Sequence, residues 1–101
     1  MPASGGDIRR ALARVDVGAV ERNSRSLKER IGAGTELCAV VKADGYGHGA
    51  AASAAAAMRG GASRLGVAAA DEAEELRLHF PEAPILVLGA LTDAELRTAI
   101  A

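Results

Sequence analysis

An α/β fold built on a parallel sheet is predicted by the alternation of apolar runs and helical segments along the chain of 101 residues. Apolar runs at 37–42, 64–69 and 85–88 predict three strands, and each run is followed by a segment with helical character. Repeated strand–helix units of this kind imply parallel strands, because each helix returns the chain to the same end of the sheet. Three strands are too few to close a (β/α)8 barrel, which needs eight strands over about 250 residues.

The first part of the chain predicts a tail, a short strand and a helix. Residues 1–9 are expected to form a disordered tail, and the mixed run at 11–17 suits a short strand. Asp16 is expected to cap the following helix. Residues with helical spacing then share one face: Val20, Ser24, Leu27 and Ile31. Gly32 and Gly34 are expected to end this helix. The continuous apolar run at 37–42 is typical of a strand covered on both faces.

The middle of the chain contains two further helices around the second strand. An alanine-rich helix is predicted at 49–59, and two glycines close it before the strand at 64–69. The helix predicted at 71–79 carries acidic residues early and basic residues late, which is the charge order that suits the helix dipole. Pro81 is expected to stop it.

The last predicted helix follows the strand at 85–88. Thr92 and Glu95 have the spacing of a capping box, which marks the start of a helix. No stop signal follows before Ala101. We therefore expect the chain to be the first part of a longer protein.

Composition and charge argue against several classes of protein. The chain has 12 lysines and arginines against 13 acidic residues, so no strong field favours a nucleic-acid or membrane partner. No apolar run approaches the roughly 18 residues of a membrane span, and the first residues lack the apolar region of a signal peptide. The single cysteine, Cys38, rules out an internal disulfide, so a cytoplasmic location is expected.

Lys42 gives the clearest indication of chemistry. It is the last residue of the first predicted buried strand, and a loop with three glycines follows it. A lysine is rarely buried unless it is paired, and desolvation at the mouth of an apolar strand favours its neutral amine, a nucleophile that forms a Schiff base with a carbonyl. Tyr46 and the glycines offer a hydroxyl and approachable backbone N–H groups, as an anionic cofactor needs. A strand-end lysine whose amine only reaches water is the alternative.

The same stretch, VKADGYGHG at 41–49, resembles over nine positions the pyridoxal-phosphate attachment signature of alanine racemases. Other features agree in order and spacing, so the resemblance covers nearly all of the chain from about Arg10 onward: Val15-Asp16 leading into a helix with Asn23, then Leu65-Gly66-Val67-Ala68, then Pro84-Ile85-Leu86-Val87-Leu88-Gly89. It implies that residues 10–101 are the N-terminal portion of a (β/α)8 TIM barrel, its first three βα units, with a β-rich domain following.

The resemblance also implies a function. It indicates interconversion of L-alanine and D-alanine with pyridoxal 5'-phosphate, in a homodimer that supplies D-alanine for cell-wall peptidoglycan. Lys42 then binds the cofactor and is one of two proton-transfer bases, the other being a tyrosine of the partner subunit. Tyr46 hydrogen-bonds the cofactor phosphate.

Alternation along the first strand adds two candidate contacts to the cofactor. It places Cys38, Val40 and Lys42 on one face, which is the interior face in a barrel. Val40 then lies beneath the cofactor, and Leu88, at the end of the third strand, lines the same mouth. Ordinary core packing is the alternative for Val40 and Leu88.

Two other functions share parts of this layout. A non-catalytic pyridoxal-phosphate carrier on the same barrel also has a lysine at the end of the first strand, although its following residues differ from those at 44–49. The pattern Gly45-x-Gly47-x-x-Ala50 satisfies a loose dinucleotide-binding fingerprint, with Asp71 or Glu72 available to a ribose hydroxyl. Against a dinucleotide, Lys42, Ala43 and Asp44 separate the first glycine from the apolar residues that end at Val41, and a lysine has no part in this fingerprint.

The remaining polar residues near the signature are given no catalytic role. Asp44 is expected to accept hydrogen bonds from loop N–H groups. His48 has no second ligand near it in the sequence, so no metal site is expected. The acidic run at 71–75 is interpreted as a solvated helix start, and His79 as a cation at the end of that helix.

Overall fold

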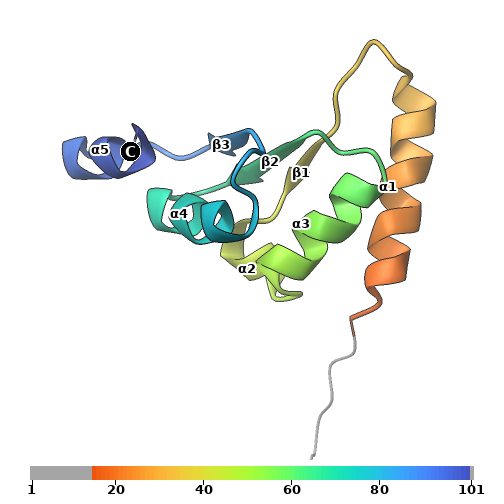
Figure 1. Cartoon of the computed structure of the whole chain (residues 1–101), viewed down its shortest axis with the longest axis horizontal. Coiled ribbons are helices and arrows are strands. Elements are labelled where there is room, and N and C mark those ends of the chain that lie inside the picture. Colours follow the sequence, from red (N-terminus) through yellow and green to blue (C-terminus); the bar gives the residue numbers. More distant parts are fainter. Residues whose placement is uncertain (1–14, 101) are drawn as a thin grey trace, which may run out of the picture.

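The computed structural model describes residues 15–100, which form three strands and five helices (Figure 1). In chain order these are α1 (Val17–Ile31), β1 (Cys38–Val40), α2 (Lys42–Tyr46), α3 (Ala50–Arg59), β2 (Arg64–Val67), α4 (Ala70–His79), β3 (Ile85–Val87) and α5 (Asp93–Ile100). The predicted alternation of strands and helices is confirmed. Among residues 15–100, no helix combines the length and the apolar character that a membrane crossing requires.

The three strands form one parallel sheet in the order β1-β2-β3, as predicted. Val40 is paired with Gly66, and Gly66 with Leu86, so the residues of this row share one face of the sheet. Hydrogen bonding between neighbours continues just beyond the strands, where the Val41 N–H donates to the Gly66 carbonyl at 2.8 Å. The loops that follow the strands therefore start side by side.

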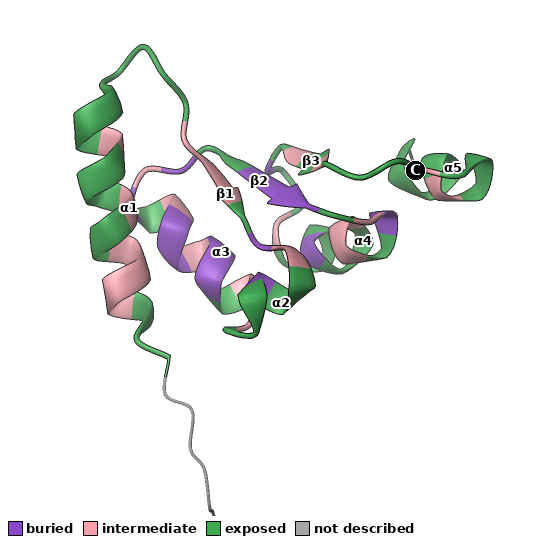
Figure 2. Cartoon of the chain, turned by 180° about the vertical axis from the view of Figure 1, so that it is seen from behind, coloured by how far each residue is buried: buried purple, intermediate pink, exposed green. Residues whose placement is uncertain are grey.

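In the described part of the chain, helices cover one face of this sheet and leave the other open. Figures 1 and 2 show α2, α3 and α4 on the same side of it. Leu65 and Val67 are fully buried beneath them, in a core that also includes Val41, Ala54, Leu76 and Ala83. On the other face Val40, Leu86 and Leu88 are 37%, 52% and 51% exposed. Within residues 15–100, the strands are therefore covered on one face, whereas the apolar run at 37–42 is typical of a strand covered on both.

Most predicted boundaries agree with the observed ones to within two residues, and the predicted strand at 11–17 can be compared only at its last three residues. Residues before 15, including the predicted tail at 1–9, lie outside the described residues, and Val17 already begins α1. Val17 is helical because the predicted cap forms, in which the Ala19 N–H donates to Asp16 Oδ1 at 3.1 Å. The capping box at α5 is also confirmed, with the Glu95 N–H donating to Thr92 Oγ1 at 3.1 Å.

Gly60, which directly follows α3, lies close against α1, and the two helices lie side by side in Figure 1. A Cβ on Gly60 would stand 2.7 Å from the Cβ of Ser24 and 3.0 Å from the backbone nitrogen of Arg25. A salt bridge of 2.8 Å between Arg59 Nε and Glu21 Oε1 joins the two helices at the same place. Only glycine allows this contact, because any side chain would push α1 away.

We expect Gly60→Ala to weaken the packing of α1 on α3 by about 1–3 kcal/mol, which is the usual cost of overpacking. Gly34→Ala is the matched control, because nothing lies within 4 Å of a Cβ at that position. Amide hydrogen exchange of residues 17–31 measures the effect and should become faster only in Gly60→Ala. Equal exchange in the two variants would show that α1 does not depend on the close approach.

Candidate functional site

The chain after β1 forms a left-handed turn. The sequence predicted a glycine-rich loop at this place. Within α2, φ is 52° at Ala43, 53° at Asp44, 66° at Gly45 and 57° at Tyr46. The left-handed conformation costs a residue other than glycine roughly 1–2 kcal/mol. Backbone strain of this kind clusters at functional sites and persists only where the surroundings hold it in place.

Hydrogen bonds on both sides hold the turn. Asp44 Oδ1 accepts from the Ala50 N–H at 2.8 Å, and the Asp44 carbonyl accepts from the Gly49 N–H at 2.8 Å. The Gly45 N–H donates to the Val41 carbonyl at 2.8 Å. A Cβ on Gly45 would lie 3.4 Å from the Ala50 backbone, so the turn packs directly against the start of α3. The predicted role of Asp44 as an acceptor for loop N–H groups is confirmed.

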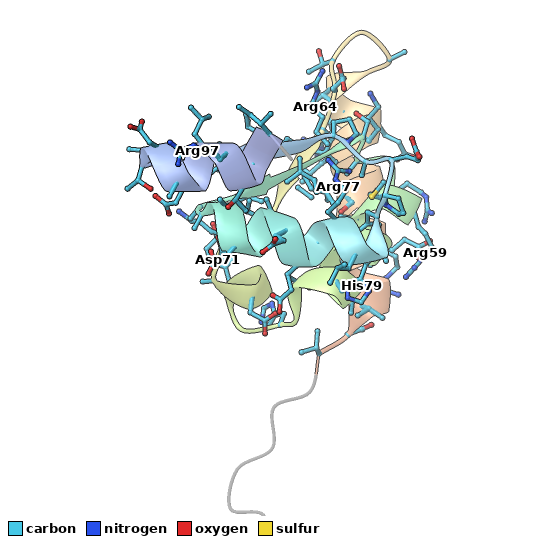
Figure 3. All side chains as sticks on the ribbon, turned by 60° about the vertical axis from the view of Figure 1, so that its left-hand side comes forward. Arg59, Arg64, Asp71, Arg77, His79 and Arg97 are labelled. Carbon is cyan, nitrogen blue, oxygen red and sulfur yellow. The ribbon has the colours of Figure 1, made fainter. Side chains whose placement is uncertain are left out.

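A third contact that holds the turn comes from Glu72 in the first turn of α4, next to Asp71, which is labelled in Figure 3. Glu72 Oε2 accepts from the Ala43 N–H at 2.8 Å. Glu72 Oε1 accepts from the Ala68 N–H at 2.8 Å and from the Ala69 N–H at 3.1 Å. One carboxylate thus joins the turn after β1 to the loop after β2.

These contacts set the ionisation of Glu72. Burial raises the pKa of the carboxyl, but the hydrogen bonds from Ala43, Ala68 and Ala69 lower it more, so the pKa lies below its usual range. The positive charge of Lys42 also lowers this pKa. The ionised carboxylate therefore stabilises the fold above its unfolded pKa, and this stabilisation is lost as the pH falls through the lower folded pKa.

Sequence reasoning missed Glu72. The acidic run at 71–75 was expected to be solvated, which is wrong for Glu72 although Asp71, Glu74 and Glu75 are exposed. One local signal was present, because a glutamate three residues after the N-cap has capping-box spacing. The N-cap, however, is Ala69, which has no side-chain acceptor. The bond to Ala43 spans 29 positions, and no local pattern predicts it.

Lys42 lies directly beyond the carboxyl end of β1 and is half-buried. The sequence predicted it as the last residue of the strand, and this boundary is wrong. The backbone leaves the extended conformation at Val41, where ψ is 28°, so alternation ends there and Lys42 begins α2. None of the ion pairs within residues 15–100 includes Lys42.

Val40 and Leu88 are brought together on the open face of the sheet. A Cβ on Gly66 would lie 3.4 Å from Val40 Cγ2, 3.5 Å from Leu88 Cδ1 and 3.4 Å from Cys38 Sγ. Side chains from β1 and from the loop after β3 thus border one apolar patch over β2, where a glycine leaves room. Val40 and Leu88 are partly exposed in the described part of the chain and are not core residues there.

The remaining candidate residues, Tyr46, His48 and His79, are exposed to solvent. Tyr46 is 60% exposed, so its hydroxyl is accessible to a ligand. His48 is exposed, and His79 lies at the far end of α4 from Asp71, as Figure 3 shows. Within residues 15–100, no group of three side chains suited to holding a metal ion is found.

The residues at this end of the sheet fit a cofactor that has a carbonyl, a ring and an anionic group. Lys42 supplies a primary amine, the group that attaches covalently to a carbonyl. The phenol of Tyr46 can donate a hydrogen bond to an anion. Val40 and Leu88 supply apolar surface for a ring. This set of groups matches the chemistry expected for pyridoxal phosphate.

A dinucleotide fits less well. Its pyrophosphate requires the backbone of the glycine-rich turn to be open to the ligand. Gly45, the first glycine of the fingerprint, is instead buried against α3. Glu72, one of the two acids considered for a ribose, is engaged with three backbone N–H groups.

Comparison with known proteins gives consistent results. The family described as "Alanine racemase, N-terminal domain" matches residues 15–101. The alanine racemase of Symbiobacterium thermophilum is 50% identical over 88 residues, which are 87% of this chain and 23% of that protein. The crystal structure of alanine racemase from E. faecalis superposes with a TM-score of 0.79 at 46% identity, covering 82% of this chain and 22% of that one.

A second solved structure is that of alanine racemase from Bacillus anthracis with bound L-Ala-P. It has a TM-score of 0.76 and 39% identity, and the match covers 84% of this chain and 23% of that one. The chain thus spans somewhat less than a quarter of the length of each of these three relatives. Since the family match includes most of the chain, the chain belongs to the alanine racemase family, in which it matches the N-terminal domain.

Proposed function

We propose that this chain is the N-terminal part of a pyridoxal-phosphate-dependent alanine racemase, which interconverts L-alanine and D-alanine. The observation that carries the proposal is Lys42, whose amine follows the end of β1 on a strained turn held by Asp44 and Glu72. Family membership supports the reaction, and the L-Ala-P bound in the B. anthracis relative supports an alanine-like ligand. The enzyme would act in the cytoplasm and would supply D-alanine for cell-wall peptidoglycan.

The proposed architecture is the first three βα units of a (β/α)8 barrel, followed by a β-rich domain in a homodimer. The open face of the sheet supports this, because Val40, Leu86 and Leu88 form an exposed apolar surface, which is unfavourable in water. In a closed barrel, the side chains of the other strands fill the interior and cover such a face.

The proposed chemistry uses the residues around the Lys42 turn. Lys42 Nζ would hold the cofactor covalently, Tyr46 would bind its phosphate, and Val40 and Leu88 would border its ring. When bound, pyridoxal phosphate supplies an electron sink that makes the Cα proton of alanine removable. Lys42 Nζ would take this proton or return it on one face of alanine.

Inversion of configuration requires a second base on the opposite face of alanine. The resemblance assigns that base to a tyrosine of the partner subunit. Because one base gives a proton and the other takes one, the reaction consumes nothing and runs in both directions.

We expect Lys42 to carry the cofactor in the full-length protein. Borohydride reduction followed by peptide mapping should place a pyridoxyl group on Lys42 and not on Lys28, the only other lysine in this sequence. Lys42→Ala should abolish racemisation of both alanine enantiomers, because attachment and one base are lost together. Lys28→Ala, whose amine donates to the Gly32 carbonyl at 3.0 Å, is the control and should stay active.

Two outcomes would contradict this assignment. A pyridoxyl label on any other lysine would exclude Lys42 as the attachment site. A labelled Lys42 in a full-length protein that does not racemise alanine would indicate a cofactor carrier in place of an enzyme.

Tyr46→Phe should weaken retention of the cofactor more than it slows turnover. The change removes one hydrogen bond to an anionic phosphate, and a bond to a charged group contributes about 1.5–3 kcal/mol. Cofactor affinity should therefore fall on the order of tenfold to a hundredfold, while turnover at saturating cofactor changes less. Titration of the cofactor-free full-length protein measures this, and an unchanged affinity would make Tyr46 a packing residue.

Residues 1–101 expressed alone should neither racemise alanine nor unfold in a single cooperative transition. The sheet would have unpaired edges, and its open apolar face would favour aggregation. Thermal unfolding and a racemisation assay with added pyridoxal phosphate test this against the full-length protein. A sharp transition together with turnover would mean that a complete catalytic domain lies within these residues.

A further inference from the structure

We propose that Glu72 is a positioning residue that orients Lys42 through the backbone. This inference rests on the proposed function, in which Lys42 binds the cofactor and moves a proton. Glu72 itself need not touch substrate or cofactor, because it acts on the turn that carries the lysine.

The geometry ties Glu72 to the residue next to Lys42. Glu72 Oε2 accepts from the Ala43 N–H at 2.8 Å, so it binds the peptide group that links Lys42 to Ala43. Rotation of that peptide group would change the direction in which the Lys42 side chain leaves the backbone. The contact therefore fixes the base of the side chain and leaves its methylene groups free to move.

The other oxygen anchors the carboxylate to the second βα unit. Glu72 Oε1 accepts from the N–H groups of Ala68 and Ala69, at 2.8 and 3.1 Å. These residues follow β2, whereas Ala43 follows β1. The lysine turn is thereby held at a fixed position relative to the neighbouring strand, and not only within its own loop.

Only a carboxylate can satisfy this arrangement. All three partners are N–H donors, so both side-chain oxygens must accept. A glutamine could direct its oxygen toward Ala68 and Ala69, but its NH2 group would then face the Ala43 N–H. This orientation keeps two of the three hydrogen bonds, whereas the opposite one keeps a single bond. We therefore expect Glu72→Gln to remove the contact to the lysine turn while it preserves the volume of the side chain and the contact to the start of α4.

The test compares Glu72→Gln with Glu74→Gln in the full-length protein. Glu74 lies on the same helix and is exposed, so this control loses the same charge without losing a bond to the turn. In the cofactor-free protein, amide exchange of residues 43–47 should be about tenfold to a hundredfold faster in Glu72→Gln. Exchange of residues 73–79 should stay the same, and Glu74→Gln should match the wild type at both segments.

A second measurement reports on Lys42 itself. The rate at which added pyridoxal phosphate attaches to Lys42, trapped by borohydride, should fall about tenfold in Glu72→Gln. Turnover at saturating alanine and cofactor should fall with it, while KM for alanine changes little, because the substrate contacts are intact. A change confined to thermal stability, with attachment and turnover at wild-type values, would overturn the proposal.

Two further controls separate the possible failures. If Glu72→Gln does not fold, Glu72→Asp takes its place, since the shorter carboxylate keeps its charge but cannot reach both loops, and the same expectations apply. If wild-type Lys42 takes up no cofactor, the proposed function fails. If wild-type Lys42 is labelled and both Glu72 variants behave as wild type, only the positioning role fails.

Discussion

The left-handed turn from Ala43 to Tyr46 is the constraint around which this end of the molecule is organised. Residues other than glycine rarely adopt this conformation, and it persists only when its neighbours fix it. Here three hydrogen bonds fix it. The Val41 carbonyl accepts from Gly45, the Asp44 side chain accepts from the first residue of α3, and Glu72 of α4 accepts from Ala43. The turn therefore depends on two successive βα units, and its geometry follows from their packing.

The two faces of the sheet differ in burial, because one forms the core and the other is partly exposed. The face under α2, α3 and α4 contains the fully buried Leu65 and Val67 and provides the core that the described residues possess. The opposite face has Gly66 at its centre, with Val40 and Leu88 around it, and it stays open. Because the core lies on the helical side, the open face can present apolar surface to a ligand or to further strands without loss of the contacts that hold the sheet together.

Local patterns were sufficient to predict the order of elements, the parallel sheet and both helix caps at Asp16 and Thr92. The reason is that caps and apolar periodicity involve neighbours in sequence. The same patterns failed where the backbone changes direction, so the strand was extended through Lys42 and the left-handed turn was not foreseen. They also failed for Glu72, since its contact with Ala43 exists only after β1 and β2 have paired.

The early end of β1 helps to explain how one lysine could serve two roles. In the proposed function, the amine of Lys42 would be both the attachment site and a base, so it would occupy two positions and its side chain would have to remain mobile. If Lys42 were still in the strand, pairing with β2 would fix its backbone in the plane of the sheet. Because the chain leaves the sheet at Val41, the turn determines the backbone at Lys42, and Glu72 is one of the three contacts that hold the turn. A rigid Cα with a flexible four-carbon stem meets both requirements, and neither a longer strand nor a flexible loop would do so.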